Sequence, residues 1–266
     1  MTDTQFDPGT PPPGVADDDH LLAAWAATVA GNLLVQVRAQ GLEGKELKDA
    51  GDQASHEFLM RLLAEHRPDD AVLSEEGKDD KVRLTSKRVW IVDPLDGTRE
   101  FSEPPRDDWA VHVALWEDGD LVAGAVAQPG LGKTFNTGQP PVVPPRSADR
   151  PRIAVSRTRP PAFVELLAEE IGADLVPMGS AGAKVISVTR DVTDAYVHAG
   201  GQYEWDSAAP VVVARAAGLH TSRADGAELA YNQDDVLLPD LLVCRPELAE
   251  QITAFVKRHW AENPPA

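Results

Sequence analysis

Apolar residues recur three and four positions apart in the first part of the chain, which predicts helices over about 20–40 and 52–65. Short apolar runs rich in β-branched residues follow, and these predict strands. The run at 71–77 is expected to form a short strand that enters a polar loop, and 88–93 a buried strand. Residues 109–128 have the pattern of a hairpin that turns at the sequence EDGD.

The second half alternates predicted strands with predicted helices, and a proline-rich segment precedes it. The prolines of PPVVPPRSADRPR (140–152) exclude regular structure, so we place a boundary within this segment. We expect a disordered Pro/Gly/Asp-rich tail over 1–16, an α+β lobe over 17–142 and an α/β lobe over 143–266. The strands of the second lobe are expected at 153–157, 194–200 and 241–245, with a further strand and a turn within 173–180. Its helices are expected at 161–172, 181–191, 207–218 and 246–260.

Charge and composition narrow the classes of function. The 266 residues include 43 acids and 25 bases, a net charge of −18, which disfavours binding to nucleic acid polymers and to anionic membranes. The single cysteine, Cys244, rules out an intrachain disulfide, and its apolar flanks predict a small buried side chain. The sequence lacks a signal-peptide pattern and an apolar run of 18 residues, so we expect a cytoplasmic protein that does not span a membrane.

The segment WIVDPLDGT (90–98) ends a buried apolar run with two closely spaced acids. Pro94 restricts the backbone, so the carboxylates of Asp93 and Asp96 can be held in one geometry with the Leu95 carbonyl between them. Mg²⁺ takes oxygen ligands of this kind. An ordinary turn explains the same residues when the segment is considered alone.

Further residues of the right types follow this segment or lie far from it. Gly97 and Thr98 stand where a helix can begin, and free N–H groups at such a start bind phosphate oxygens. Glu75, in SEEG, follows a short strand, and Asp206, in WDSAAP, lies at a helix start. Taken singly, Glu75 fits a solvated surface acid and Asp206 fits a helix N-cap.

The motifs SEEG, WIVDPLDGT and WDSAAP occur here in the order found in the inositol monophosphatase superfamily of metal-dependent, lithium-sensitive phosphatases. The chain resembles that superfamily over about 20–260. The resemblance implies an α/β (α+β) fold, a five-layer α-β-α-β-α sandwich with the site between the two halves. It also implies two or three Mg²⁺ ions per site and a possible homodimer.

The resemblance assigns the metal ligands residue by residue. Glu75, Asp93 and the backbone oxygen of Leu95 match the ligands of the first metal. Asp93, Asp96 and Asp206 match those of the second, with Asp93 bridging the two ions. Glu75 is also expected to take part in catalysis.

The same resemblance implies the remaining catalytic positions. Thr98 matches a threonine that orients the attacking water, and Asp52 an aspartate that supports this threonine. Backbone N–H groups of Gly97 and Thr98 would meet the phosphate. The family usually has T-x-x-D at this point, whereas this chain has Asp49 in place of the threonine, which leaves open whether Asp52 supports Thr98 alone.

Residues around these motifs bear on the substrate. The continuation REF after DGT resembles the 3′-phosphoadenosine-5′-phosphate phosphatase branch, the CysQ type, and so does the stretch GSAGAKV. Arg99 and Lys184 would pair with a second phosphate, and Tyr203 and Asp206 would also contact the substrate. Alternatives are an ion pair of Arg99 with a neighbour and a solvated Lys184; His198 fits either a pocket wall or a core histidine.

The implied activity is Mg²⁺-dependent hydrolysis of the 3′-phosphate of 3′-phosphoadenosine 5′-phosphate (PAP) to AMP, in sulfate assimilation. Hydrolysis of the sulfated form (PAPS) to adenosine 5′-phosphosulfate stays open. The alternatives are inositol monophosphate or fructose 1,6-bisphosphate at the same site. A more distant alternative is a non-catalytic protein that binds a nucleotide or a cation.

Overall fold

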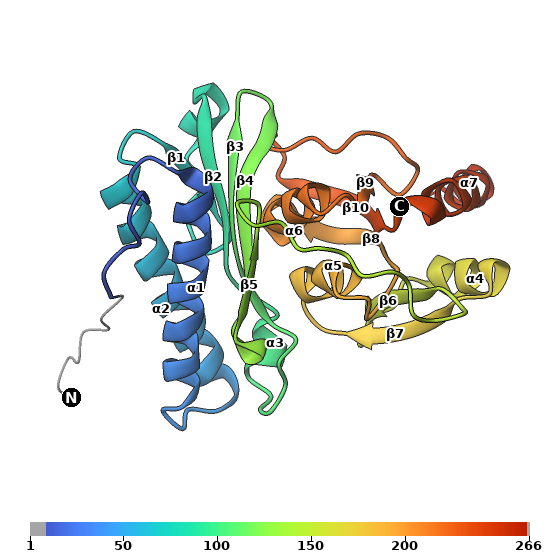
Figure 1. The fold of residues 1–266 in the computed structure, drawn as a ribbon, viewed down its shortest axis with the longest axis horizontal. Coiled ribbons are helices and arrows are strands. Elements are labelled where there is room, and N and C mark those ends of the chain that lie inside the picture. The colour runs from blue at the N-terminus through green and yellow to red at the C-terminus, as the bar shows by residue number, and fades with distance from the viewer. Residues whose placement is uncertain (1–8, 265–266) are drawn as a thin grey trace.

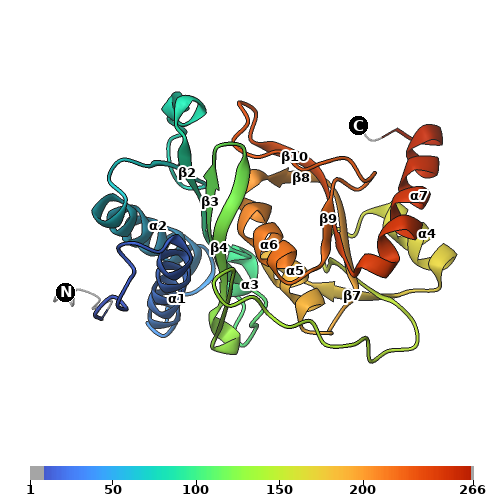
Figure 2. The same ribbon diagram turned by 45° about the horizontal axis from the view of Figure 1, so that its top comes forward.

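The computed structural model describes residues 9–264 and forms a layered sandwich. A helix pair, a five-stranded sheet, a second helix pair, a second five-stranded sheet and a third helix pair follow one another across the molecule (Figure 1). The rotated view shows the same order of layers (Figure 2). The predicted five-layer α-β-α-β-α fold is confirmed.

The first sheet has the strand order β1-β2-β3-β4-β5, with β1 parallel to β2 and the other neighbours antiparallel. Helices α1 and α2 cover one of its faces (Figure 1). Its elements are α1 (Asp19–Arg38), α2 (Gly44–His66), β1 (Ala71–Ser74), β2 (Arg88–Asp96), α3 (Thr98–Phe101), β3 (Ala110–Glu117), β4 (Asp120–Gln128) and β5 (Lys133–Asn136).

The second sheet has the order β7-β6-β8-β10-β9, with β6 parallel to β7 and β8, and β10 antiparallel to its neighbours. Helices α5 and α6 lie between the two sheets, and α4 and α7 cover the outer face (Figures 1 and 2). The elements are β6 (Arg152–Ser156), α4 (Ala162–Ile171), β7 (Asp174–Met178), α5 (Ala181–Thr189), β8 (Ala195–Tyr203), α6 (Glu204–Ala216), β9 (His220–Ser222), β10 (Leu237–Cys244) and α7 (Pro246–Glu262).

Three apolar clusters fill the four interfaces between the five layers, and the middle cluster covers both faces of the α5/α6 layer. The central space joins the lobes, because α6 packs directly on the first sheet. A Cβ atom at Gly124 of β4 would lie 2.5 Å from Val212 Cγ1 of α6. Glycine at this position therefore permits the close approach of helix and sheet.

Helix α1 is long and apolar enough to cross a membrane by length and composition alone. In this structure it packs against β3, β4 and α2, and half of its apolar window is buried. A core helix that lies against a sheet has the same composition.

Several boundaries differ from those predicted. Helix α2 begins at Gly44 and not at Asp52, because the polar residues before Asp52 continue the same helix. The strands β2 and β8 extend to Asp96 and Tyr203. The sequence pattern missed β5 and β9, which have four and three residues and depend on pairing with β4 and β10.

The predicted first lobe is bounded by an N-terminal tail and by the proline-rich segment between the lobes. Residues 1–8 of the expected tail lie outside the described residues. Val15 is buried, and its carbonyl accepts a hydrogen bond from Arg67. The boundary placed between 142 and 143 falls within the irregular segment 137–151.

Candidate active site

A β-bulge in β2 brings the two acids of the DPLD segment to one side. Asp93 pairs with His112 of β3 and Asp96 with Ala110, so three steps along β2 match two along β3. In a regular strand, residues three apart point to opposite faces, and one extra residue cancels that alternation. The bulge contains Pro94, which has no N–H to donate to a ladder.

Three carboxylates from both lobes meet at this point. Ligand atoms of Asp93, Asp96 and Asp206 lie within 4.8 Å of one another. Glu75, just after β1, lies close enough to the cluster to interact electrostatically with Asp206 and Asp96 and to contact Asp93. The N–H of Leu95 donates to Asp93 Oδ1 at 3.0 Å. The structure thus collects all four acids that the sequence placed in a metal site.

Asp96 also joins the two lobes at the start of α5. Its carboxylate accepts hydrogen bonds from Ser180 Oγ at 2.5 Å and from the N–H groups of Ala181 at 3.1 Å and Gly182 at 2.7 Å. His112 Nε2 lies 3.1 Å from Asp96 Oδ2. Burial alone would raise the pKa of Asp96, but His112 and these donors lower it to about 2.

The other acids of the cluster have raised pKa values. Loss of solvent, followed by repulsion from Asp206, raises the pKa of Glu75 to about 7. Burial and then Asp96 raise the pKa of Asp206 to about 6, and burial and then Glu75 raise that of Asp93 well above its usual value. Acids that repel one another when charged are the donor set that a hard divalent cation neutralises. The residues present therefore fit a metal ion.

Asp206 lies within the first turn of α6 and is not the N-cap that the sequence pattern allowed. The helix begins at Glu204, its N-cap is Tyr203, and Asp206 Oδ2 accepts a hydrogen bond from the Tyr203 N–H at 2.6 Å. This bond closes a capping box and fixes the orientation of the carboxylate. Asp206 therefore points into the cluster from a rigid first turn.

A buried arginine ties the start of α6 to the first lobe. Arg83 is fully buried, is paired with Asp79, and donates from Nη1 to Asn232 Oδ1 at 2.8 Å. Glu204 accepts hydrogen bonds from the N–H of Asn232 and of the next residue, at 2.6 and 2.7 Å. Because Glu204 is two residues before Asp206, this network positions Asp206 relative to the first lobe.

Thr98 lies at the start of α3, where its hydroxyl is shared between two acceptors. Its Oγ1 is 3.1 Å from the Leu95 carbonyl and 3.4 Å from Asp52 Oδ1. Burial, and then Glu76, raise the pKa of Asp52 to about 6. Asp49 instead forms an exposed ion pair with a lysine one helical turn earlier. In this structure Asp52 is the acid that reaches Thr98.

Gly97 occupies a position that only glycine adopts readily. Its φ is 84°, and a Cβ atom here would lie 3.1 Å from Ser180 Cβ and 3.3 Å from the Asp108 carbonyl oxygen. The chain therefore turns sharply out of β2 and into α3, whose first N–H groups lack partners within the helix.

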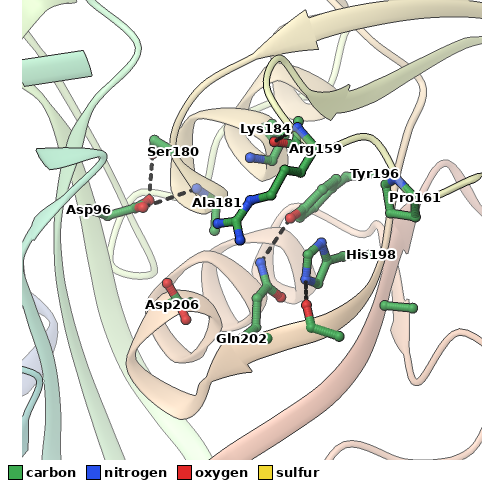
Figure 3. Close-up of a pocket in the computed structure, with 14 residues that line it drawn as sticks. Asp96, Arg159, Pro161, Ser180, Ala181, Lys184, Tyr196, His198, Gln202 and Asp206 are labelled. Atoms are coloured by element: carbon green, nitrogen blue, oxygen red, sulfur yellow. Dashed lines mark hydrogen bonds between the residues drawn. The ribbon is translucent and has the colours of Figure 1, made fainter. Parts of the chain in front are cut away.

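A pocket of about 400 Å³ opens beside the acidic cluster (Figure 3). Asp96 and Asp206 line one end, and Lys184, Tyr196 and His198 line the rest. Lys184 is buried with Nζ 5.2 Å from the centre of the Tyr196 ring, so it is not the solvated lysine that the sequence also allowed. His198 is a wall of this pocket.

Two predicted substrate residues lie outside this pocket. Tyr203 is 43% exposed and stacks on Trp205, with ring centres 4.9 Å apart. Arg99 lines a neighbouring pocket, and Glu100 pairs with Arg157 and not with Arg99. Tyr203 contributes to the site through its backbone N–H on Asp206.

Sequence reasoning missed Arg159, which extends into the pocket from the loop after β6 (Figure 3). The available signal was a basic tripeptide, RTR, at the carboxyl end of a predicted strand, where α/β folds place ligands. It also missed His112, whose place in an alternating apolar strand gave no sign of its contact with Asp96.

The profile of the inositol monophosphatase family matches residues 21–261. The chain belongs to the inositol monophosphatase family. It is 50% identical over 244 residues to the 3′-phosphoadenosine 5′-phosphate phosphatase of Mycobacterium tuberculosis (strain CDC 1551 / Oshkosh), an alignment that covers 87% of this chain and 90% of the relative.

Solved structures of this family share the fold. CysQ from Bacteroides thetaiotaomicron superposes with a TM-score of 0.71 at 27% identity, over 84% of this chain and 96% of that one. Inositol monophosphatase II from Staphylococcus aureus MSSA476 has a TM-score of 0.73 at 24% identity, over 88% and 94% of the two chains, which shows the fold alone. The protein is thus a phosphatase of the inositol monophosphatase family whose acidic cluster could hold a metal.

Proposed function

We propose that this protein hydrolyses the 3′-phosphate of 3′-phosphoadenosine 5′-phosphate, giving AMP and phosphate. The observation that carries the proposal is a single cavity lined both by Asp96 and Asp206 of the acidic cluster and by the cations Arg159 and Lys184. A substrate with two phosphates matches both groups, because one can meet a bound metal and the other a cation. The 50% identity to a protein named for this activity supports the proposal.

A divalent metal bound at the acidic cluster would supply an activated water and would neutralise charge on the transferred phosphoryl group. The chain's own groups do the rest. Asp93, Asp96 and Asp206 would hold the metal, with Glu75 and the Leu95 carbonyl as further ligands.

Orientation of the attacking water falls to Thr98. When its hydroxyl donates to Asp52, the oxygen lone pairs are free to accept a hydrogen bond from a water in the cavity. With a pKa of about 6, Asp52 is close to the range of a general base near neutral pH. The N–H groups of Gly97 and Thr98 face the phosphate oxygens at the start of α3.

The proposal extends to several finer points. The metal is Mg²⁺, with two or three ions per site, and lithium inhibits the enzyme. The protein acts in the cytoplasm in sulfate assimilation, as a possible homodimer. The sulfated nucleotide PAPS is a second substrate of the same chemistry.

The test compares kcat/KM for PAP, inositol 1-phosphate and fructose 1,6-bisphosphate with Mg²⁺ present. The proposal predicts that PAP exceeds both others by at least 10-fold. A preference for either of the other two would overturn the substrate assignment while leaving a phosphatase. Nucleotide binding by calorimetry without Mg²⁺-dependent phosphate release would instead show a non-catalytic binding protein.

A further inference from the structure

Two cavities meet at one group of residues beside the acidic cluster. The pocket of about 400 Å³ contains Asp96 and Asp206, and a second pocket of about 230 Å³ lies next to it. Arg159 and Lys184 line both. These two cations therefore stand at the junction, in the same cavity as the metal-binding acids.

The cations at this junction differ in whether a carboxylate already neutralises them. Arg157 is committed to the first lobe, since it pairs with Glu100 at 2.6 Å and with Glu103 at 2.7 Å. Arg159, two residues later, has no ion pair within residues 9–264. Its side chain is exposed and extends into the larger pocket (Figure 3). The guanidinium is therefore available to an anion.

Lys184, which lines the same two pockets as Arg159, also has no carboxylate within ion-pair distance among the described residues. It is only 6% exposed, and its Nζ lies 3.5 Å from the Gly179 carbonyl and over the Tyr196 ring. A buried ammonium group without a charge partner is unfavourable unless an anion approaches it. The chain has a net charge of −18, so two cationic side chains without ion-pair partners at one junction form a local position that favours an anion.

We propose that Arg159 binds the phosphate that is not hydrolysed, the 5′-phosphate of the nucleotide, and so determines specificity for a bisphosphate. This inference rests on the proposed function. Both phosphates belong to one ribose, so a nucleotide whose 3′-phosphate meets the acidic cluster extends along the cavity towards the junction. A guanidinium grips phosphate oxygens in bidentate fashion, which an ammonium cannot do.

Arg159 is a better candidate than the other arginines of the second pocket. Arg99 and Arg157 line only the smaller pocket, whereas Arg159 lines both. Arg159 follows β6 in a short loop that ends at Pro161, the residue before α4, so its backbone is restricted near the point of contact. A monophosphate substrate would leave the guanidinium without a partner.

The experiment compares two substrates that differ only in the 5′-phosphate, PAP and 3′-AMP. Arg159→Gln should lower kcat/KM for PAP by 10- to 100-fold and that for 3′-AMP by less than 2-fold. Arg159→Lys should recover part of the loss, because it keeps the charge but not the bidentate grip. Arg146→Gln, at an exposed arginine of the linker that lines neither pocket, serves as the control and should change neither value.

Comparing PAP with 3′-AMP distinguishes an error in the role of Arg159 from an error in the proposed function. Equal losses on PAP and 3′-AMP, or no loss on either, would overturn the role of Arg159 while the wild-type protein still hydrolyses PAP. If the wild-type protein fails to hydrolyse PAP, the proposed function itself is wrong and this inference falls with it. The turnover of 3′-AMP by Arg159→Gln also reports that the variant is folded.

Discussion

The acidic cluster should destabilise the metal-free protein, so removing one of its charges should stabilise it. Asp206→Asn removes the charge with the least other disturbance, because the amide oxygen can still accept the hydrogen bond from the Tyr203 N–H. Burial, and then repulsion by Asp96, raise the pKa of Asp206 from 3.8 to about 6 in the folded protein. A group that binds its proton more tightly when folded opposes folding once the pH exceeds both pKa values.

The magnitude follows from that pKa. A rise from 3.8 to about 6 corresponds to about 3 kcal/mol above pH 6. Solvent screening reduces this value, and loss of a negative charge from the first turn of α6 removes about 0.5 kcal/mol of helix-dipole stabilisation. We therefore expect Asp206→Asn to increase the free energy of unfolding by about 1–2 kcal/mol at pH 8 in EDTA. The gain should shrink as the pH falls through 6 and be nearly absent at pH 4, where the wild-type carboxyl is largely protonated in the folded state.

Urea unfolding of both proteins at pH 4, 6 and 8 in EDTA measures this directly. Asp149→Asn, at an exposed acid of the linker, is the control and should change stability by less than 0.5 kcal/mol. Mg²⁺ should then reverse the order, since it stabilises the wild type by about 2.7 kcal/mol at 100 times its Kd and the variant much less. An Asp206→Asn protein that is no more stable than wild type at pH 8 would refute the reasoning.

Three further predictions test how the site is held. Arg83→Met should lower the free energy of unfolding by about 3–5 kcal/mol in urea titrations, because it breaks a buried hydrogen-bond network. The control Glu170→Gln, at an exposed ion pair, should lower it by less than 1 kcal/mol, and similar losses in both variants would contradict this. Gly182→Ala places a Cβ atom 2.0 Å from His112 Nε2, so it should displace the contacts that Asp96 makes with His112 and the start of α5, and should reduce kcat at least 10-fold. Full activity of the variant would show that these contacts do not matter for catalysis. Thr98→Val, which replaces the hydroxyl with a methyl group of similar size, should lower kcat for PAP about 100-fold with KM little changed. A change in KM alone would make Thr98 a binding residue.

Local sequence was enough for those parts of the site that lie within one segment. The spacing of Asp93, Pro94 and Asp96 gave the two acids and the stiff link between them, and the structure brings both into the cluster. The bulge explains why a three-residue spacing works here. No periodicity rule predicts a bulge, because it depends on the register against β3.

Contacts between distant segments could not be predicted from the sequence. Asp96 accepts hydrogen bonds from residues 84–86 positions later, at the start of α5. Arg159 is free to bind an anion because Glu100 and Glu103 of the first lobe form ion pairs with Arg157 instead, and the sequence does not show which arginine they pair with. The sequence left open whether Lys184 binds a phosphate or is solvated, and its burial follows from the packing of α5 between the sheets, which no local pattern shows.

The central claim is that the acidic cluster between the lobes holds the Mg²⁺ ions that drive hydrolysis of PAP. Phosphate release from PAP, measured with wild type and Asp93→Asn over a Mg²⁺ titration, tests it most directly. We expect wild-type turnover to require Mg²⁺ and Asp93→Asn to lose it by at least 1,000-fold at every Mg²⁺ concentration, since the variant removes the acid shared by both predicted metals. Near-wild-type turnover by Asp93→Asn, or wild-type turnover that persists in EDTA, would contradict the claim.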